Sequence, residues 1–397
     1  MSRPIDPVAA VTHADPYSYY ASLVANQPFH HNQLVGTWVA ASAGAVTTVL
    51  SNPSCRVRPA AEPTPPALIG SVAGDIFARL VRMTDGSGHE PLRRAVSSPL
   101  SAIDQRHVRQ LSRAWSHQLV MPTSTPDTPP FAFCLPVLVL GSLLGLGSTA
   151  LERIAGEVDC LVSAFSPLSG PDERERGIAA AESLRATTAA SIPAHPDTPL
   201  AALAHAGVVE GLGRDVIVAN AIGLMTQACE ATAGLIANTI VALWAQPDIR
   251  AELAVDPPTL ERIVTEVARW DPPVQNTRRY VADDCTLLGQ PLRRGDSVLV
   301  VLAAANRDPA ANAEPDRFDP WRTRSRCFTF GAGPHACPGQ HLALPIAVAG
   351  VEALLGAELV PDTPPATIRY RPSANTRIPL LRGITSPRDQ SLEGETP

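Results

Sequence analysis

The sequence of 397 residues contains no lysine, so arginine supplies all 32 basic side chains. The chain also has little excess of charge, with a formal net charge of -6. A mild acidic excess argues against nucleic acid as a partner, because phosphate binding requires a basic face. The absence of lysine, together with abundant alanine, favours an origin in a GC-rich bacterial genome.

The sequence also lacks the patterns of a secreted or membrane-anchored protein. Its seven cysteines are scattered without a C-x-x-C pair, so neither a disulfide framework nor a zinc site is expected. The N-terminal stretch has no basic start followed by an apolar run, and no membrane anchor is predicted. We therefore expect a cytoplasmic chain without membrane or nucleic-acid partners.

The spacing of apolar residues predicts a mostly helical chain with a small strand-rich part. Helices are expected over 17–26, 43–50, 89–96 and onward, 131–146, 171–190, 210–246, 257–270 and 340–355. Strands are expected over 34–41, 279–282, 286–288 and 297–302. The proline-rich stretch 56–75 is predicted to be a long surface loop.

The strongest motif is a glycine-rich loop that ends in a cysteine before an apolar helix. Residues 330–339 read F-G-A-G-P-H-A-C-P-G. The glycines allow close backbone approach and positive φ angles. The N-terminus of the following helix favours the thiolate form of Cys337. A thiolate in this position can bind haem iron, to which it donates electron density that favours O–O cleavage.

With this loop the sequence resembles the cytochrome P-450 family of haem-thiolate monooxygenases, and the resemblance runs from about residue 15 to residue 382. It implies a mainly α-helical cytochrome P-450 fold, a large helical domain with a small β-rich lobe. We expect one such domain over 1–397, with a polar tail at about 388–397. The resemblance also implies haem b as the cofactor, Cys337 as the iron ligand, dioxygen as a reactant and a place in bacterial secondary metabolism.

Two further groups of residues match family positions. Glu266 and Arg269 stand one helical turn apart and resemble the family's structural ion pair, with Arg317 as the expected third member. Haem propionates need cations, and His89 and Arg93 can share one helix face. The resemblance implies that the haem is held by His89, Arg93, Ala228, Arg279, Phe330, Gly331, His335, Cys337 and Gly339.

The long helix departs from the family pattern at the catalytic position. In relatives, an acid followed by a threonine passes protons toward the dioxygen that reacts at the haem. Here Glu230 matches the acid, but Ala231 replaces the threonine and Gln227 replaces a small residue. Thr232 lies about 100° further around the helix and should not replace the hydroxyl directly. We expect Glu230, Ala231, Thr232 and Cys337 at the catalytic centre.

Two interpretations of this departure stay open. In the first, ordered water or Thr232 restores the relay of an ordinary hydroxylase. In the second, a polar group of the substrate completes the relay, which also suits radical coupling. By analogy with relatives that link aromatic rings in cyclic dipeptides or peptides, we expect a polar aromatic small molecule as substrate. A terpenoid or polyketide hydroxylase or epoxidase is the alternative.

The resemblance places the substrate on the far side of the haem from Cys337. Its expected walls are residues 60–84, 163–200, 227–232, 274–276 and 373–376. The expected substrate contacts are Gln227, Val274, Gln275 and Asn276. No flavin or iron–sulfur motif is visible, so ferredoxin and ferredoxin reductase are the expected electron donors. Their expected docking face carries Arg94, Arg106, Arg109 and Arg113.

Two other classes of function stay open on the sequence alone. The first is a haem protein that binds a ligand or peptide without turning over oxygen. Product formation driven by NADH through ferredoxin and its reductase would exclude this class. The second is a peroxide-driven oxygenase, which turns over with peroxide but not with a redox chain.

Overall fold

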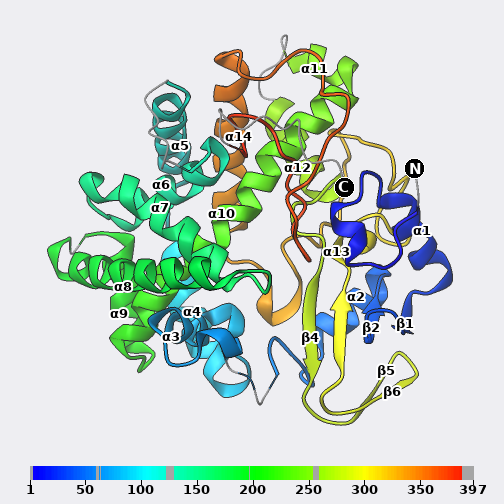
Figure 1. The fold of residues 1–397 in the computed structure, drawn as a ribbon, viewed down its shortest axis with the longest axis horizontal. Helices are drawn as coiled ribbons and strands as arrows, with labels where there is room; N and C mark the ends of the chain where they lie inside the picture. Colours follow the sequence, from blue (N-terminus) through cyan, green and yellow to red (C-terminus); the bar gives the residue numbers. More distant parts are fainter. Residues whose placement is uncertain are drawn as a thin grey trace.

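The computed structural model describes residues 3–59, 62, 64–121, 129–195, 197–253 and 259–386. A large helical body lies beside a smaller lobe of strands (Figure 1). This arrangement confirms the predicted mainly helical architecture with a small β-rich lobe. The remaining residues, which include the whole of the expected polar tail at 388–397, lie outside the described part of the chain.

The helical body is organised around one continuous cluster of buried aliphatic side chains. Its helices are α3 (Val72–Arg79), α4 (His89–Ser101), α5 (Gln105–Val120), α6 (Phe131–Leu144), α7 (Ser148–Phe165), α8 (Pro171–Ala194), α9 (Pro199–Val209), α10 (Arg214–Ala245), α11 (Pro247–Leu253), α12 (Thr259–Trp270) and α14 (Gln340–Gly356). α6 is buried almost all round, as its unbroken apolar sequence requires. α10 packs against α6, α12 and α14 in the middle of this body (Figure 1).

α10 is long and apolar enough, by length and composition, to cross a membrane. However, 67% of its most apolar window is buried inside the protein, so the core accounts for its apolar surface. Gly234 allows a close approach to the segment after α12, since a Cβ there would lie 2.7 Å from the Cβ of Pro273. α10 thereby holds its central turns against the segment that follows α12.

The strand lobe is built on a five-stranded sheet in the order β1-β2-β7-β4-β3. Its strands are β1 (Phe29–Asn32), β2 (Thr37–Ala40), β3 (Cys55–Arg56), β4 (Thr277–Val281) and β7 (Ser297–Val300). A separate hairpin pairs β5 (Cys285–Leu287) with β6 (Gln290–Leu292). β2 and β7 pair in parallel, with Trp38 opposite Val298, so the sheet joins distant parts of the chain.

Three short helices accompany these strands. They are α1 (Tyr17–Asn26), α2 (Ala43–Ser51) and α13 (Leu302–Asn306). α2 packs against β2, β3 and β7, and α1 packs against α13. Buried side chains of α2, β4 and β7 form a second, smaller core, which supports the segment that enters β4.

The structure corrects several predicted boundaries. The strand expected over 34–41 is confined to β2, because the preceding residues form a turn in which Gly36 has φ 62°. The stretch 56–75 is not entirely loop, since α3 begins where the Ser71 hydroxyl accepts a hydrogen bond from the Gly74 amide. The long helix begins at Arg214 instead of 210, after Gly211 with φ 71°.

Candidate functional site

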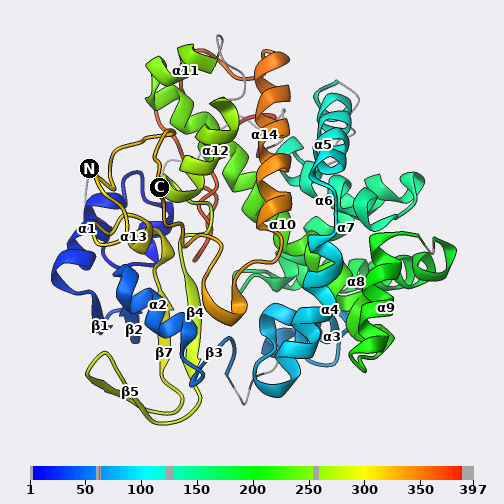
Figure 2. The same cartoon turned by 180° about the vertical axis from the view of Figure 1, so that it is seen from behind.

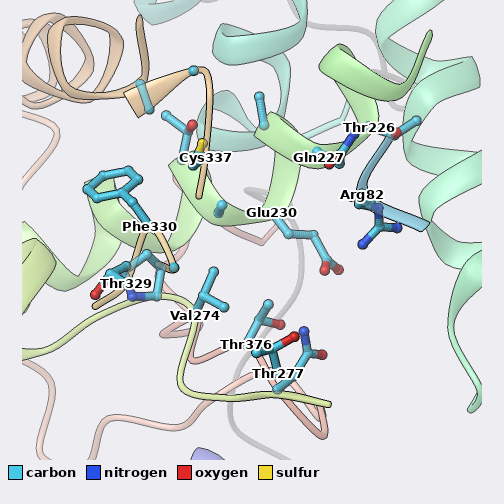
Figure 3. A pocket seen from close by; sticks show the side chains of 18 of the residues that line it. Arg82, Thr226, Gln227, Glu230, Val274, Thr277, Thr329, Phe330, Cys337 and Thr376 are labelled. Carbon is cyan, nitrogen blue, oxygen red and sulfur yellow. The ribbon is translucent and has the colours of Figure 1, made fainter. Parts of the chain in front are cut away.

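A cavity of about 550 Å³ lies between α10 and the cysteine loop (Figure 3). The ends of α4 and α7 and the segment 371–376 complete its walls. It brings together nearly all of the residues that the sequence predicts to act in one site. These are His89, Arg93, Gln227, Ala228, Glu230, Ala231, Thr232, Val274, Asn276, Arg279, Phe330, Gly331, His335, Cys337 and Gly339.

The cysteine loop is held in place by backbone geometry. The Cys337 amide donates to the Phe330 carbonyl at 2.8 Å, and the Gly331 amide donates to the Phe328 carbonyl at 2.8 Å. Gly331 and Gly333 have φ values of 71° and 68°, which favour glycine. A Cβ at Gly333 would also lie only 2.9 Å from the Leu50 carbonyl oxygen. The loop therefore sits tightly on the end of α2.

The sulfur of Cys337 faces the cavity, and this residue is the exposed one among the seven cysteines. Although the residue opens onto the cavity, the protein packed around its sulfur limits the contact with water, and this desolvation raises the pKa of Cys337. The backbone amides of Gly339 and Gln340 and the charge of Arg93 act in the opposite direction. A bound cation would tip this balance to the thiolate, which is the form that ligates metals.

Four basic side chains lie at one end of the cavity, and the carboxylates around them are too few to pair with all four. The rings of His89 and His335 lie 4.2 Å apart between centroids. His89 Nε2, His335 Nδ1 and Arg279 Nε are buried and have no hydrogen-bond partner among the described residues. Burial, together with the charges of His335 and Arg93, lowers the pKa of His89, and burial lowers the pKa of Arg93 and Arg279. The Asp85 carboxylate lies 3.2 Å from His335 Nε2.

These observations fit a haem. Within the described chain, no group of three or more His, Cys, Asp or Glu side chains could enclose a metal ion. A metal at Cys337 therefore needs ligands that the protein does not supply, as a macrocycle does. The unpartnered basic groups provide the donors that two propionates would accept. The chemistry of the donor set thus suits the predicted cofactor.

The structural ion pair behind this loop requires one correction. Arg269 is completely buried and donates to Glu266 through Nη2 at 2.6 Å and Nε at 3.0 Å. The third member is not Arg317, whose side chain is mostly exposed and pairs with Glu314. Arg322 takes this place, with Nε 3.5 Å from Glu266 Oε1. The chain turns back after residue 317, and only the Arg317 carbonyl faces Arg269.

On the opposite wall, α10 presents the altered relay sequence. The Glu230 carboxylate lies 3.4 Å from Arg371 Nη1. Burial raises the pKa of Glu230, although Arg371 acts in the opposite direction. Ala231 offers only a methyl group, and the Thr232 hydroxyl is buried without a partner among the described residues. The Gln227 amide folds back and donates to the Gly223 carbonyl at 2.7 Å.

Of the three substrate contacts that are expected in the segment before β4, the structure places two on the cavity wall. Val274 and Asn276 line the cavity, and Val274 forms a β-bridge with Thr376. Gln275 does not line it. This side chain is completely buried and donates to the Pro272 carbonyl at 2.7 Å. Successive side chains of an extended segment point to opposite faces, so Gln275 turns away from its two neighbours.

The sequence interpretation did not single out two arginines of the cavity. Arg371 lies just before the expected wall 373–376, and Arg82 lies inside the expected wall 60–84. Figure 3 shows Arg82 and Glu230 extending into the same part of the cavity. Neither arginine belongs to a recognisable motif, because its role depends on the approach of α10 from a distant part of the chain.

The expected docking face is already partly neutralised. α5 and α14 run side by side (Figure 2), and Arg113 on α5 lies 3.1 Å from Glu352 on α14. Arg94 lies 2.7 Å from Glu210, and Arg109 lies 3.8 Å from Glu261. Of the four arginines expected there, Arg106 alone has no carboxylate within 4.0 Å in the described chain. The free positive charge of this face is therefore smaller than the sequence indicates.

Comparisons with known proteins agree with this geometry. The family model described as Cytochrome P-450 matches residues 200–355. The chain is 31% identical over 278 residues to a Xylella fastidiosa protein named cytochrome P-450 133B2, covering 68% of this chain and 70% of the relative. It is also 31% identical over 283 residues to mycinamicin IV hydroxylase/epoxidase of Micromonospora griseorubida, with 68% and 70% covered.

The fold has a close counterpart among solved structures. The crystal structure of CalO2 superposes with a TM-score of 0.83 and 25% sequence identity. The superposition covers 95% of this chain and 97% of that chain. The similarity extends over the helical body and the strand lobe together.

Proposed function

Because the chain belongs to the cytochrome P-450 family, we propose that it is a haem-thiolate enzyme that oxidises a polar small molecule, whose own hydrogen-bonding group completes proton delivery. The chain is an oxidoreductase, as are its relatives named hydroxylase and monooxygenase. We place it in the bacterial cytoplasm and in secondary metabolism. Ferredoxin and ferredoxin reductase are the proposed electron donors.

The observation that carries this proposal is the missing hydroxyl at Ala231. The neighbouring Thr232 also lines the cavity, but its hydroxyl is buried and has no hydrogen-bond partner among the described residues. Glu230 is in place as an acid, held 3.4 Å from Arg371. The cavity surface at this turn of α10 therefore has an acid but no adjoining alcohol, and a polar group of the substrate can fill that position.

The cavity residues have two kinds of role: one wall would hold the haem, and the wall formed by α10 faces the substrate. Haem b, when bound, supplies the dioxygen chemistry and the oxidising power. Cys337 would hold the iron through its sulfur, while His89, Arg93, Arg279 and His335 would hold the propionates. These assignments rest on the unpartnered basic groups at that end of the cavity.

On the substrate side, Glu230 holds the proton. Its carboxyl has a raised pKa because of burial, which keeps its proton available at a higher pH than that of a free acid. Arg371 fixes the orientation of the carboxylate at 3.4 Å. Glu230 passes its proton to the substrate group or ordered water beside Ala231, and Val274 and Asn276 position the substrate against that turn.

The polar lining supports a substrate with several hydrogen-bonding groups. The side chains of Ser163, Ser166, Asn276, Ser373 and Asn375 all lie on the cavity wall. We propose a polar aromatic molecule such as a cyclic dipeptide or peptide, oxidised by hydroxylation or radical coupling. A macrolide is the second candidate, because the relative from Micromonospora griseorubida is named a mycinamicin IV hydroxylase/epoxidase.

A Soret-band titration of the ferric holoenzyme tests the substrate class. Cyclic dipeptides that contain tyrosine or tryptophan should shift the spectrum from low to high spin, with macrolides and terpenoids as controls. Product formation with NADH, ferredoxin and ferredoxin reductase should follow with the same ligands. A response to macrolides alone would contradict the aromatic substrate, and turnover with peroxide alone would contradict the redox chain.

Replacing Ala231 by threonine tests whether a polar group of the substrate takes the place of the missing hydroxyl in proton delivery. For the wild-type enzyme we compare a substrate with its N-methylated analogue, which lacks the donor group. The fraction of consumed electrons that ends in product should be about 10-fold or more lower with the analogue. In A231T the new hydroxyl should remove most of this loss. Thr232→Val tests the alternative in which the Thr232 hydroxyl carries the relay, and under the proposal it should leave coupling unchanged because that hydroxyl is buried. Equal coupling and products in the wild type and A231T would exclude a role for this position.

A further inference from the structure

Arg82 is a cation of the cavity wall that the proposed reaction does not use. It lies in the 3-10 turn Val81–Met83, between α3 and α4. Its side chain lines the cavity. In the described chain no carboxylate lies within 4.0 Å of its guanidinium, and no hydrogen bond of its side chain is found. Because this side chain is exposed and has no protein partner in the described chain, a ligand in the cavity can reach its guanidinium and supply the opposite charge.

The surrounding residues hold Arg82 in position. The Val81 amide donates to Asn220 Oδ1 on α10 at 2.8 Å, and Asn220 Nδ2 donates to the Arg79 carbonyl at 2.8 Å. The guanidinium lies 5.9 Å from the centre of the Phe77 ring, and that ring packs edge-on against Phe165. The backbone of the turn is thus fixed to α10, so Arg82 leaves the main chain at a defined point of the cavity wall.

The other charges of the cavity already have partners or a task. Arg371 lies 3.4 Å from Glu230 and is also close enough to Asp159 to affect its pKa. Glu230 is the carboxylate that interacts most with Arg82, but it lies beyond ion-pair distance and is shared with Arg371. The basic groups that would hold the haem form a separate cluster around His335 and Asp85. Arg82 is therefore left over after the acid, its partner and the cofactor have been accounted for.

We propose that Arg82 is a specificity-determining residue that binds a carboxylate of the substrate. The planar guanidinium can donate two parallel hydrogen bonds to a carboxylate, a geometry that a neutral amide cannot match. The single unpaired guanidinium can neutralise one negative charge, so a substrate with one carboxylate near this wall matches it. This inference rests on the proposed function and narrows its substrate class. It favours peptides with a free carboxylate, at the C-terminus or on a side chain, over neutral cyclic dipeptides.

The test uses ligands whose binding does not depend on the unknown substrate. Imidazole coordinates haem iron and shifts the Soret band to longer wavelength. A series of ω-(imidazol-1-yl)alkanoic acids of increasing chain length carries this anchor together with a carboxylate, and the matching primary amides lack only the charge. Imidazole itself reports whether the haem site of the proposed function exists, and the change in the ratio of acid to amide affinity on replacing Arg82 reports on Arg82.

In the wild-type holoenzyme, at least one acid of the series should bind about 10-fold or more tightly than its amide. In R82Q this preference should fall to about one, while the affinity of the amide and of imidazole stays the same. R82K retains the charge without the planar fork and should give an intermediate ratio. R79Q is the matched control: Arg79 pairs with Asp75 on its own helix, α3, and does not line the cavity, so this variant should leave the ratio unchanged.

Two results would overturn the proposal. The first is an acid-to-amide ratio near one at every chain length in the wild type. The second is a preference for the acid that survives in R82Q. If R82Q does not incorporate haem, the ratio measured for R82K decides, and a ratio equal to that of the wild type excludes bidentate recognition. A phosphonate series that outperforms the carboxylates would identify a different anion and would also contradict the proposal.

Discussion

Glu266 illustrates how one buried carboxylate joins two segments of the chain, α12 and the stretch 319–322. Its two oxygens accept hydrogen bonds from Arg269, and Oε1 also accepts from the Asp319 amide at 3.0 Å. Arg322 approaches the same oxygen at 3.5 Å, and its side chain is 9% exposed. By contrast, the side chain of Arg317 is 63% exposed. The two arginines are therefore expected to contribute differently to the free energy of unfolding, although they lie close together in the sequence.

Substitution of each arginine by alanine should show this difference. We expect R322A to lower the free energy of unfolding by about 1–3 kcal/mol, because the buried Glu266 carboxylate loses a charged neighbour and two backbone carbonyls lose their donor. R317A should change it by less than about 0.5 kcal/mol, since its ion pair is exposed. Denaturant unfolding followed by far-UV circular dichroism measures both values. A larger loss in R317A than in R322A would restore the assignment expected from the sequence.

For single residues, the sequence identifies those that belong to a motif more readily than it identifies which side chains lie next to each other in the fold. Cys337, His89 and Glu230 stand in recognisable patterns, and the structure brings them to one cavity; their roles stay predictions. Gln275 was misplaced because the alternation of an extended segment was not applied to it. Arg82 could not be singled out, since its environment is created by a turn of α10 more than a hundred positions away.

Among the elements, β1 is one that the sequence analysis did not predict. It pairs with β2 from Phe29↔Ala40 to Asn32↔Thr37, and its sequence F-H-H-N has little of the usual strand character. The strand forms because its partner is fixed in the sheet by β7. His30 lies on this strand, with Nδ1 against the Gln27 carbonyl at 2.9 Å and Nε2 buried without a partner in the described chain.

His30 should make stability depend on pH. Burial lowers the pKa of His30, so the folded state favours the neutral ring. This contribution is fully present above the pKa of the unfolded chain and is lost as pH falls through the lower folded value. Between about pH 7.5 and about pH 5.5, the wild type should therefore lose more free energy of unfolding than H30Q does.

The control for this measurement is H117Q, because His117 is exposed on α5. H117Q should retain the pH dependence of the wild type in urea unfolding. A wild type and H30Q with parallel profiles would show that the buried ring does not contribute.

Helices that are long and apolar, or that are bounded by proline or glycine, were the easiest elements to predict. α1 matches its expected range, and α14 extends only one residue beyond it. Errors arose where glycine conformation decided the boundary, as at Gly36 before β2 and Gly211 before α10. Composition alone does not reveal which glycine adopts a positive φ angle.

For the whole molecule, Arg377 connects the two ends of the described chain. It is 2% exposed and donates to Asp271 at 3.0 Å. It also donates to the carbonyls of Val11, His13 and Ala14 in the N-terminal segment. Tyr17 donates to the same Asp271 carboxylate. This network joins the N-terminal segment, the end of α12 and the last strand-like segment.

Loss of this network should affect the entire fold. We expect R377A to lower the free energy of unfolding by about 3–5 kcal/mol, because it leaves Asp271 buried without its charged partner. R377K should recover only part of this loss, since one ammonium cannot reach all of the carbonyls. The exposed Arg185 on α8 provides the control, and R185A should change stability by less than about 0.5 kcal/mol.

Limited proteolysis gives an independent measurement of the same network. In R377A the segment before α1 should be cleaved faster than in the wild type, because its carbonyls lose their common donor. Unchanged cleavage together with unchanged stability would show that Tyr17 and Asp271 hold the segment without the arginine.

The exposure of Cys337 into the cavity has a practical consequence for preparations of this protein. The other six cysteines are buried or partly buried, so a maleimide reagent should label Cys337 first in chains without haem. Iron coordination masks the same sulfur. The proportion of singly alkylated chains in a mass spectrum therefore measures the fraction of apoprotein, without an extinction coefficient and before any substrate is known.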